Sequence, residues 1–337
     1  MLKYITRRVL VIPPLLLGVV TVTFLITRLI PANPLATVLN PRSLGDKQVV
    51  AAAEEHWGLN GTILQQFGRY IVNLLHGDMG TSFVTKGPVS SDIALRLPFT
   101  LELVFASIVI AVIGGIGIGV LAAVRQNKFT DTLGRLFTLV GSSTPQYWSG
   151  LVLLLILSTR LHLLPGPGQL YPQVYAPHRY TGFYVLDTLI AGNWQLCWQA
   201  IEHLILPAFI LGWGVMGSIA RIVRASMLDV LNQDFVRTAR AKGARESAVV
   251  LVHALRNALL PALTIIGFSV AYLLSGDVLV EDIFQWGGIG SYAVTAAESL
   301  DYPAIMGVVI VGGIAFLVAS LLTDIGYAFA DPQIRVA

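Results

Sequence analysis

The stretch FTLELVFASIVIAVIGGIGIGVLAAV, residues Phe99–Val124, decides the fold class of this chain. Glu102 is its only charged residue, and the rest is almost entirely apolar. A helix of roughly 20 apolar residues crosses the hydrocarbon core of a bilayer, and it satisfies its own backbone hydrogen bonds there. The stretch therefore predicts a membrane-spanning helix.

Similar apolar stretches recur along the whole chain. The 337 residues are 55% hydrophobic and 12% charged, which lies outside the usual composition of soluble domains. We predict an all-α polytopic membrane protein. Six spans are expected, at Val9–Ile30, Phe99–Val124, Leu136–Ser158, His203–Ala220, Leu259–Val280 and Ala304–Phe329.

The positions of Lys and Arg predict how the chain is oriented. Most of the 22 basic residues lie before the first span or in the segments 125–135 and 221–257. Short basic loops stay on the cytoplasmic side, so both termini are expected in the cytoplasm. The predicted regions are an N-terminal helix (1–30), an extracytoplasmic cap (31–98), a membrane core (99–329) with a cytoplasmic loop (221–257), and a cytoplasmic tail (330–337).

Several function classes are excluded by residue types and spacing. The net charge of +3 is distributed beside apolar runs, which is typical of membrane topology and not of a nucleic-acid binder. The single Cys197 cannot form an internal disulfide. No phosphate-binding loop, HExxH or GxSxG motif occurs, so neither ATP hydrolysis nor the common hydrolases are expected. Five histidines lack the regular spacing of a metal site: His56, His76, His162, His178 and His203.

The segment 221–257 carries the pattern of two helices joined by a sharp turn. Apolar residues such as Met227, Leu231 and Phe235 recur at helical spacing, with charged residues between them. Lys242-Gly243 is a helix stop, and a second helical pattern begins at Arg245. A helix held between two spans could move both as a lever. Periodicity leaves two alternatives open: a basic loop that only sets topology, and a helix on the membrane surface.

Two acidic residues at the end of the fifth expected span are candidates for a substrate path. Asp277 and Glu281 could meet the amino terminus of a substrate, since ionisable residues in spans are costly and often functional. The alternative is that they lie in water at the interface. In the second span, Gly115-xxx-Gly119 predicts close helix packing.

Several ordered motifs resemble the dipeptide/oligopeptide permease family of ATP-binding-cassette importers. The stretch from Arg224 to Pro261, including DFVRTARAKG and HALRNALLP, resembles the family's EAA loop. Similar motifs are LLHGDMGTS from Leu74 to Ser82 and STPQYWSG from Ser143 to Gly150. The likeness continues to the closing DPQIR, residues Asp331–Arg335, and so covers nearly the whole chain.

This resemblance implies a type I importer fold and a division of labour among subunits. It implies a second homologous permease subunit, two ATPase subunits that bind ATP and magnesium, and an extracytoplasmic peptide-binding protein. This chain itself would be non-catalytic, would bind no cofactor and would contact membrane lipid. The residues that would couple it to the ATPase are Phe235, Val236, Arg237, Thr238, Ala239, Arg240, Ala241, Lys242 and Gly243.

The chain departs from the general family pattern in a few places. Arg237 and Lys242 stand where the generic EAA loop has acidic residues, as in the peptide subtype. Gly287-Gly288-Ile289-Gly290 has Gly where Pro is usual, and Asn60-Gly61-Thr62 replaces the usual turn of the cap. Peptide import is the expected function. The alternatives are nickel or glutathione import within the same family, and a self-sufficient channel or secondary transporter.

Overall fold

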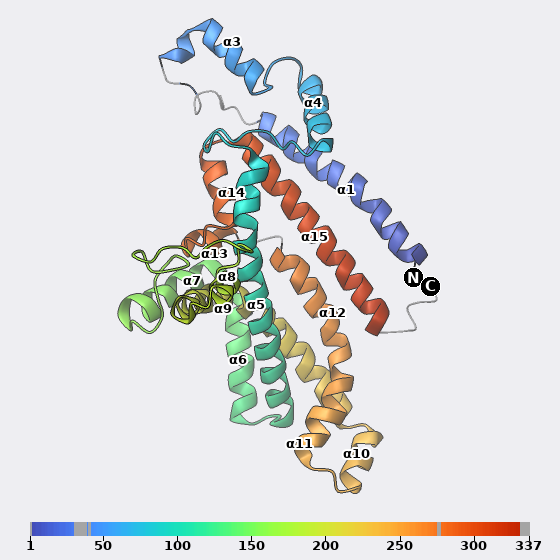
Figure 1. Cartoon of the computed structure of the whole chain (residues 1–337). Coiled ribbons are helices and arrows are strands. Elements are labelled where there is room, and N and C mark those ends of the chain that lie inside the picture. Colours follow the sequence, from blue (N-terminus) through green and yellow to red (C-terminus); the bar gives the residue numbers. More distant parts are fainter. Residues whose placement is uncertain (1, 30–38, 40–41, 275–277, 331–337) are drawn as a thin grey trace.

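The computed structural model describes residues 2–29, 39, 42–274 and 278–330, and every regular element in these ranges is a helix (Figure 1). The molecule is elongated. Helices α3 (Lys47–His56) and α4 (Ile63–Leu75) form one end, and helices α10 (Asp234–Ala241) and α11 (Glu246–Ala248) form the other. The all-helical class is therefore confirmed.

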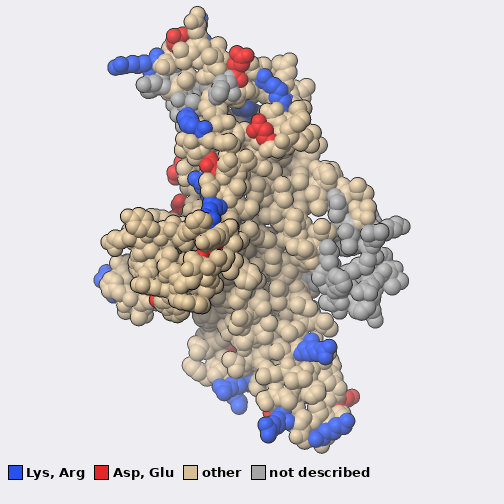
Figure 2. All heavy atoms as spheres, viewed as in Figure 1, with Lys and Arg blue, Asp and Glu red and all other residues tan. Residues whose placement is uncertain are grey.

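Among the described residues, five helical stretches are long and apolar enough to cross a membrane. Figure 2 shows Lys and Arg gathered at the two ends of the molecule, with few charged side chains in the broad belt between them. Large apolar side chains face outward in this belt; Phe105 is 70% exposed and Ile113 is 69% exposed. The five stretches are Leu10–Leu29 of α1 (Leu2–Leu29), α5 (Val89–Val124), α9 (Trp194–Leu231), Glu246–Leu274, and Tyr302–Thr323 of α15 (Tyr302–Ala330).

Two of these helices are longer than the bilayer requires. Helix α5 has 36 residues and α9 has 38, where the sequence predicts spans at Phe99–Val124 and His203–Ala220. At about 1.5 Å per residue, each is roughly 55 Å long against a hydrocarbon core of about 30 Å. Both helices therefore extend beyond the length needed to cross the hydrocarbon core.

The third expected span, Leu136–Ser158, is not one uninterrupted helix. Helix α6 (Phe129–Ser143) ends at Thr144, whose backbone is extended with φ −93° and ψ 135°, and α7 (Gln146–Leu153) begins after Pro145. The proline ring disfavours a helical conformation of the residue before it, and proline lacks the N–H that a helix needs. The chain then continues as a π-helical stretch, η2 (Leu154–Arg160). The expectation of a continuous helix here is wrong for this reason.

The fifth expected span, Leu259–Val280, begins earlier than predicted. It overlaps the helical stretch Glu246–Leu274, which combines α11, the π-helical η3 (Val249–Ala254) and α12 (Leu255–Leu274). Residues 275–277 lie outside the described residues, and Val280 lies in α13 (Val278–Ile283), which precedes α14 (Ile289–Glu298).

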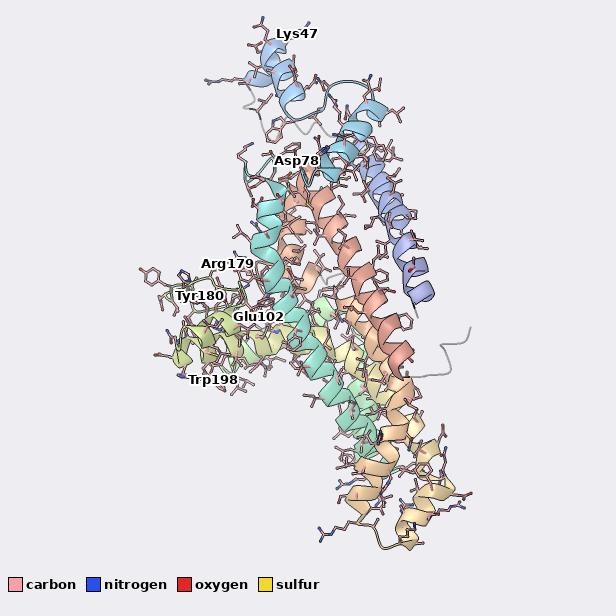
Figure 3. All side chains as sticks on the ribbon, turned by 45° about the vertical axis from the view of Figure 1, so that its right-hand side comes forward. Lys47, Asp78, Glu102, Arg179, Tyr180 and Trp198 are labelled. Atoms are coloured by element: carbon pink, nitrogen blue, oxygen red, sulfur yellow. The ribbon has the colours of Figure 1, made fainter. Side chains whose placement is uncertain are left out.

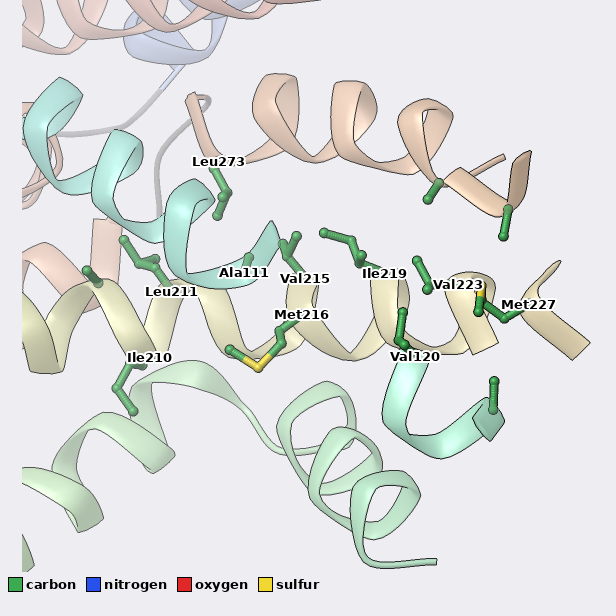
Figure 4. Close-up of a cluster of buried hydrophobic side chains, with 14 of the residues drawn as sticks. Ala111, Val120, Ile210, Leu211, Val215, Met216, Ile219, Val223, Met227 and Leu273 are labelled. Carbon is green, nitrogen blue, oxygen red and sulfur yellow. The ribbon is translucent and has the colours of Figure 1, made fainter. Parts of the chain in front are cut away.

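The core of the molecule lies between α5 and α9, and glycines allow these helices to approach closely (Figure 4). A Cβ atom on Gly115 would lie 2.8 Å from Ile219, and one on Gly119 would lie 2.8 Å from the carbonyl oxygen of Ala220. Such distances are too short for any side chain. The predicted packing role of Gly115-xxx-Gly119 is confirmed.

A lobe formed by α7, η2, α8 (Tyr184–Ile190) and the beginning of α9 projects to one side of the bundle (Figures 1 and 3). Hydrogen bonds fasten it to α5. The Glu102 carboxylate accepts hydrogen bonds from the backbone N–H groups of Tyr184 and Val185, and Arg179 donates to the carbonyl oxygens of Ala94 and Leu95. Glu102 therefore caps the N-terminus of α8.

The α3–α4 segment folds onto the end of α1. Thr62 and Gln65 form a reciprocal capping box that begins α4. Phe67 of α4 packs edge-to-face on Phe24 of α1 with ring centroids 5.2 Å apart. A folded segment is thus confirmed within the region expected as a cap, preceded by a 3-10 turn η1 (Ser43–Gly45).

The direction of the helices separates the two ends of the molecule. Helix α1 runs toward α3 and α4, and α15 runs back alongside it, so the beginning of α1 and the end of α15 point toward the α10 end (Figure 1). Of the expected tail, 330–337, residues 331–337 lie outside the described residues. The described parts of the expected cap (31–98) and of the loop 221–257 lie toward opposite ends of the molecule, and the side of the membrane on which each lies stays a prediction.

Candidate functional site

Helix α10 lies between two membrane-crossing helices, with short turns on both sides. It follows α9 after Asn232-Gln233, and Asp234 places an acidic residue in its first turn, where the helix dipole favours it. It ends at Lys242, whose N–H donates to the carbonyl oxygen of Thr238. Gly243 then takes a left-handed backbone conformation with φ +77°, which residues other than glycine rarely adopt. The two helices joined by a sharp glycine turn, as predicted from the sequence, are therefore present, and the action of α10 as a lever stays a prediction.

One face of α10 is anchored and the other is exposed. Val236 is fully buried and Ala239 packs against the main core, while α10 as a whole lies on η3. Phe235 is 40% exposed, an unusual state for a large aromatic side chain among charged neighbours. Outward positions of the predicted stretch are Phe235, Arg237, Thr238, Arg240, Ala241, Lys242 and Gly243.

Ion pairs shape the two turns around α10. Arg240 donates to Glu246 at 2.7 Å across the Gly243 turn, and Arg237 lies 3.5 Å from Asp234. Both pairs are largely exposed, so solvent screening weakens their contribution to stability. Hydrogen bonding to the Glu246 carboxylate raises the pKa of Arg240. Arg240, which the sequence suggested as a contact for an ATPase, thus also holds the turn in shape.

An ion pair that sequence reasoning missed joins the first turn of α6 to the C-terminal part of α9. The side chain of Asp131 is fully buried, and Arg224 donates to both its oxygens at 2.8 Å. The backbone N–H of Asn127 also donates to it, at 2.9 Å. The hydrogen bonds from Arg224 outweigh burial and lower the pKa of Asp131 to about 2. Asp131 is the only acidic residue in the basic stretch 125–135, a signal that could have identified it.

Of the two acidic residues proposed for a substrate path, the structure describes only Glu281. Asp277 lies outside the described residues. Glu281 is 2% exposed in α13; it accepts a hydrogen bond from the Thr100 hydroxyl at 2.7 Å and from the Gly290 N–H at 2.8 Å. It therefore links α5, α13 and α14 inside the subunit. Its part in a substrate path stays a prediction.

A cavity of about 630 Å³ opens where α6 breaks before Pro145. Its other walls come from α9 and α12, which flank the α10 segment in the chain, and from α13. Hydroxyl, amide and aromatic side chains line it, and among the described residues Arg221 is its only charged lining residue. The polar and aromatic lining residues are Ser142, Thr144, Gln146, Tyr147, Ser218, Arg221, Phe268, Ser269 and Tyr272. Within the described residues, no group of three or more His, Cys, Asp or Glu side chains could hold a metal ion.

Two family models together match nearly the whole chain. The model described as binding-protein-dependent transport system inner membrane component matches residues 115–336, and the corresponding N-terminal model matches residues 1–104. The chain belongs to this family. These inner membrane components are multi-pass membrane proteins of transport systems that depend on a binding protein, which agrees with the apolar helices described above.

Individual members of the family are similar over almost their full length. A dipeptide transport system permease protein of Alkalihalophilus pseudofirmus is 40% identical over 99% of this chain and 100% of its own. A probable D,D-dipeptide transport system permease protein of Escherichia coli is 39% identical, covering 94% of this chain and 93% of its own. A glutathione transport system permease protein of Salmonella paratyphi A is 38% identical over 99% of both chains.

Proposed function

We propose that this chain is a permease subunit that moves dipeptides or oligopeptides across the inner membrane, driven by separate ATPase subunits. One observation carries the proposal: α10 is anchored through Val236 between two membrane-crossing helices and presents Phe235 and basic side chains outward. A partner that binds this face can move α9 and α12 together. The names of the family members, most of them peptide permeases, supply the substrate class.

The proposal includes the arrangement in the membrane. The α10 end and both termini face the cytoplasm, and the α3–α4 segment is the extracytoplasmic cap. The interrupted stretch from Leu136 to Arg160 completes a sixth crossing, in which the break at Pro145 is buried against a partner and not exposed to lipid. The basic residues at the α10 end support this orientation.

The partners follow from the same reasoning. A second homologous permease subunit closes the path, two ATPase subunits bind ATP and magnesium, and an extracytoplasmic binding protein delivers the peptide. The cavity at Pro145 is the part of the path that belongs to this chain. Its hydroxyl and amide groups can exchange hydrogen bonds with a peptide backbone of any sequence, which suits a transporter of varied peptides.

Reconstituted vesicles test the proposal directly. The chain is assembled with its partner permease, the two ATPases and the binding protein, and uptake of a labelled dipeptide is measured with and without ATP. We expect uptake that requires both ATP and the binding protein, and competition by unlabelled dipeptides. Uptake by the chain alone without nucleotide would support a self-sufficient transporter, while competition by nickel or glutathione but not by dipeptides would reassign the substrate.

A further inference from the structure

A second, smaller cavity lies between α1, the α3–α4 segment and the first turn of α15, far from α10 (Figure 1). Its volume is about 360 Å³, within the range of small-molecule sites. Figure 2 shows this face hollowed below the α3–α4 segment, with basic atoms inside the hollow and acidic atoms at its edge. The labelled Asp78 in Figure 3 lies at the same junction.

Three residues that line the cavity each carry a polar atom that is shielded from water and has no hydrogen-bond partner among the described residues. These atoms are Nε of Arg28, the hydroxyl oxygen of Tyr70 and Oε1 of Gln66. The amide nitrogen of Gln66 already donates to the Leu59 carbonyl oxygen at 2.7 Å, so its Oε1 is left as an acceptor. Buried polar groups without partners are costly, and three around one cavity indicate a ligand that supplies both acceptors and a donor.

The charges around the cavity balance. Arg28 and Arg69 are basic, and Glu55 and Asp78 are acidic. Arg69 donates to the carbonyl oxygen of Asn60, whereas the Arg28 guanidinium lies over the ring of Phe24 at 5.1 Å. A ligand with one negative and one positive group matches this lining better than a simple anion, because an anion alone would leave both carboxylates unneutralised.

The depth of the cavity points to lipid. Arg28 lies in the last turn of the first membrane-crossing stretch, and Tyr302 is the first residue of the last one. Both therefore lie at the edge of the hydrocarbon core, at the level of phospholipid headgroups. Below them, Leu25 and Ile26 of α1 are 45% and 55% exposed, so acyl chains can lie along α1.

We propose that this cavity binds the phosphoethanolamine headgroup of a phospholipid. The phosphate oxygens accept hydrogen bonds from Arg28 and the Tyr70 hydroxyl. The ammonium group donates to Oε1 of Gln66 and is neutralised by Glu55 and Asp78. A bound lipid would join α1, α4 and α15, and would stabilise the α3–α4 segment against the bundle.

Native mass spectrometry of the full chain in detergent tests this site. Phosphatidylethanolamine, phosphatidylcholine and inorganic phosphate are titrated separately. We expect phosphatidylethanolamine to bind at least about 10-fold more tightly than phosphatidylcholine, whose quaternary ammonium has no N–H for Gln66. Equal binding of the two lipids would overturn the proposal. Displacement of the lipid by inorganic phosphate at similar concentrations would assign the site to a free anion instead.

Substitutions locate the binding to this cavity. Tyr70→Phe removes one hydroxyl group and should weaken phosphatidylethanolamine binding about 5-fold, and Arg28→Gln should weaken it about 10-fold or more. Tyr180→Phe, at an exposed tyrosine in the lateral lobe, is the matched control and should leave binding unchanged. Binding unaffected by Tyr70→Phe and Arg28→Gln would show that the lipid lies elsewhere. A thermal melt of each variant confirms that it is folded.

Discussion

The two oxygens of Asp131 each accept a hydrogen bond of 2.8 Å from the guanidinium of Arg224, which lies 93 positions later in the chain. This bidentate pair joins the first turn of α6 to the last turns of α9, shortly before α10. A force on α10 can pass along α9, and the pair links α6 to that helix. A bidentate pair of this kind is stronger and more directional than a single ion pair.

Removing the Asp131 carboxylate should destabilise the protein strongly. Asp131→Ala leaves Arg224 without its partner in a largely buried position, at an expected cost of about 3–5 kcal/mol. Asp229→Ala, at an exposed position on the same helix as Arg224, is the control and should change stability by at most about 0.5 kcal/mol. Denaturant unfolding of the purified variants measures both. Equal stabilities would mean that the pair contributes nothing to the fold.

The same pair predicts an acid transition. The pKa of Asp131 is about 2 in the folded chain against 3.8 when unperturbed. A carboxyl whose pKa is lowered on folding stabilises the protein above the unperturbed value, and this contribution is lost as pH falls toward the folded value. The stability difference between the native chain and Asp131→Asn should therefore be constant above about pH 4 and shrink between pH 4 and 2. A difference that does not change over this range would contradict the assignment.

The turn after α10 should require a residue that accepts a left-handed backbone. Nothing lies within 4 Å of a Cβ placed on Gly243, so a substitution there causes backbone strain and no collision. Gly243→Val should cost about 1–3 kcal/mol locally, reorient α10 and reduce peptide uptake and the ATPase activity that accompanies it. Gly243→Asn is the control, since asparagine tolerates this conformation, and should retain most of both. Equal activities would separate the turn from coupling.

Glycine should matter at only one of two neighbouring positions in α5. In Gly115→Ala the new methyl group would collide with Ile219, so α5 and α9 must separate, at a cost of about 1–3 kcal/mol. Gly117 has nothing within 4 Å, and Gly117→Ala should be neutral or stabilising by up to about 1 kcal/mol. Thermal unfolding in detergent compares the two. Similar melting temperatures would show that close approach of the helices is not needed.

Two prolines show why the sequence predicted a helix correctly at one position and missed the interruption between α6 and α7 at the other. Pro207 remains inside α9, where its neighbours Leu206 and Ala208 are buried, whereas Pro145 ends α6. Local chemistry disfavours a helix at both positions. The residues beside Pro207 pack in the main core, whereas Thr144 borders a cavity. Packing between residues far apart in the chain cannot be predicted from a short stretch of sequence.

In the candidate site, too, local sequence predicted some features, and others depend on contacts made only in the folded chain. Lys242-Gly243 located the end of α10 and its turn, because a glycine stop is a local property. Helical periodicity predicted one helix continuing out of the fourth span, and it missed the break at Asn232-Gln233 between α9 and α10. The inward direction of Val236, the pairing of Arg240 with Glu246 and the burial of Glu281 against Thr100 depend on residues that meet only in the folded chain. Glu281 was therefore proposed from its position in a span, without knowledge of its partners.

Apolar composition and charge placement alone determined that this chain is a helical membrane protein with an amphipathic helix between two spans, because a bilayer accepts few backbone arrangements and selects them by composition. Only the tertiary structure showed that Asp131 pairs with Arg224, that the helix is interrupted at Pro145, and that Arg28, Gln66 and Tyr70 surround one cavity. Those relationships join residues far apart in the chain, and they arise from the way helices pack, which no single stretch of sequence specifies.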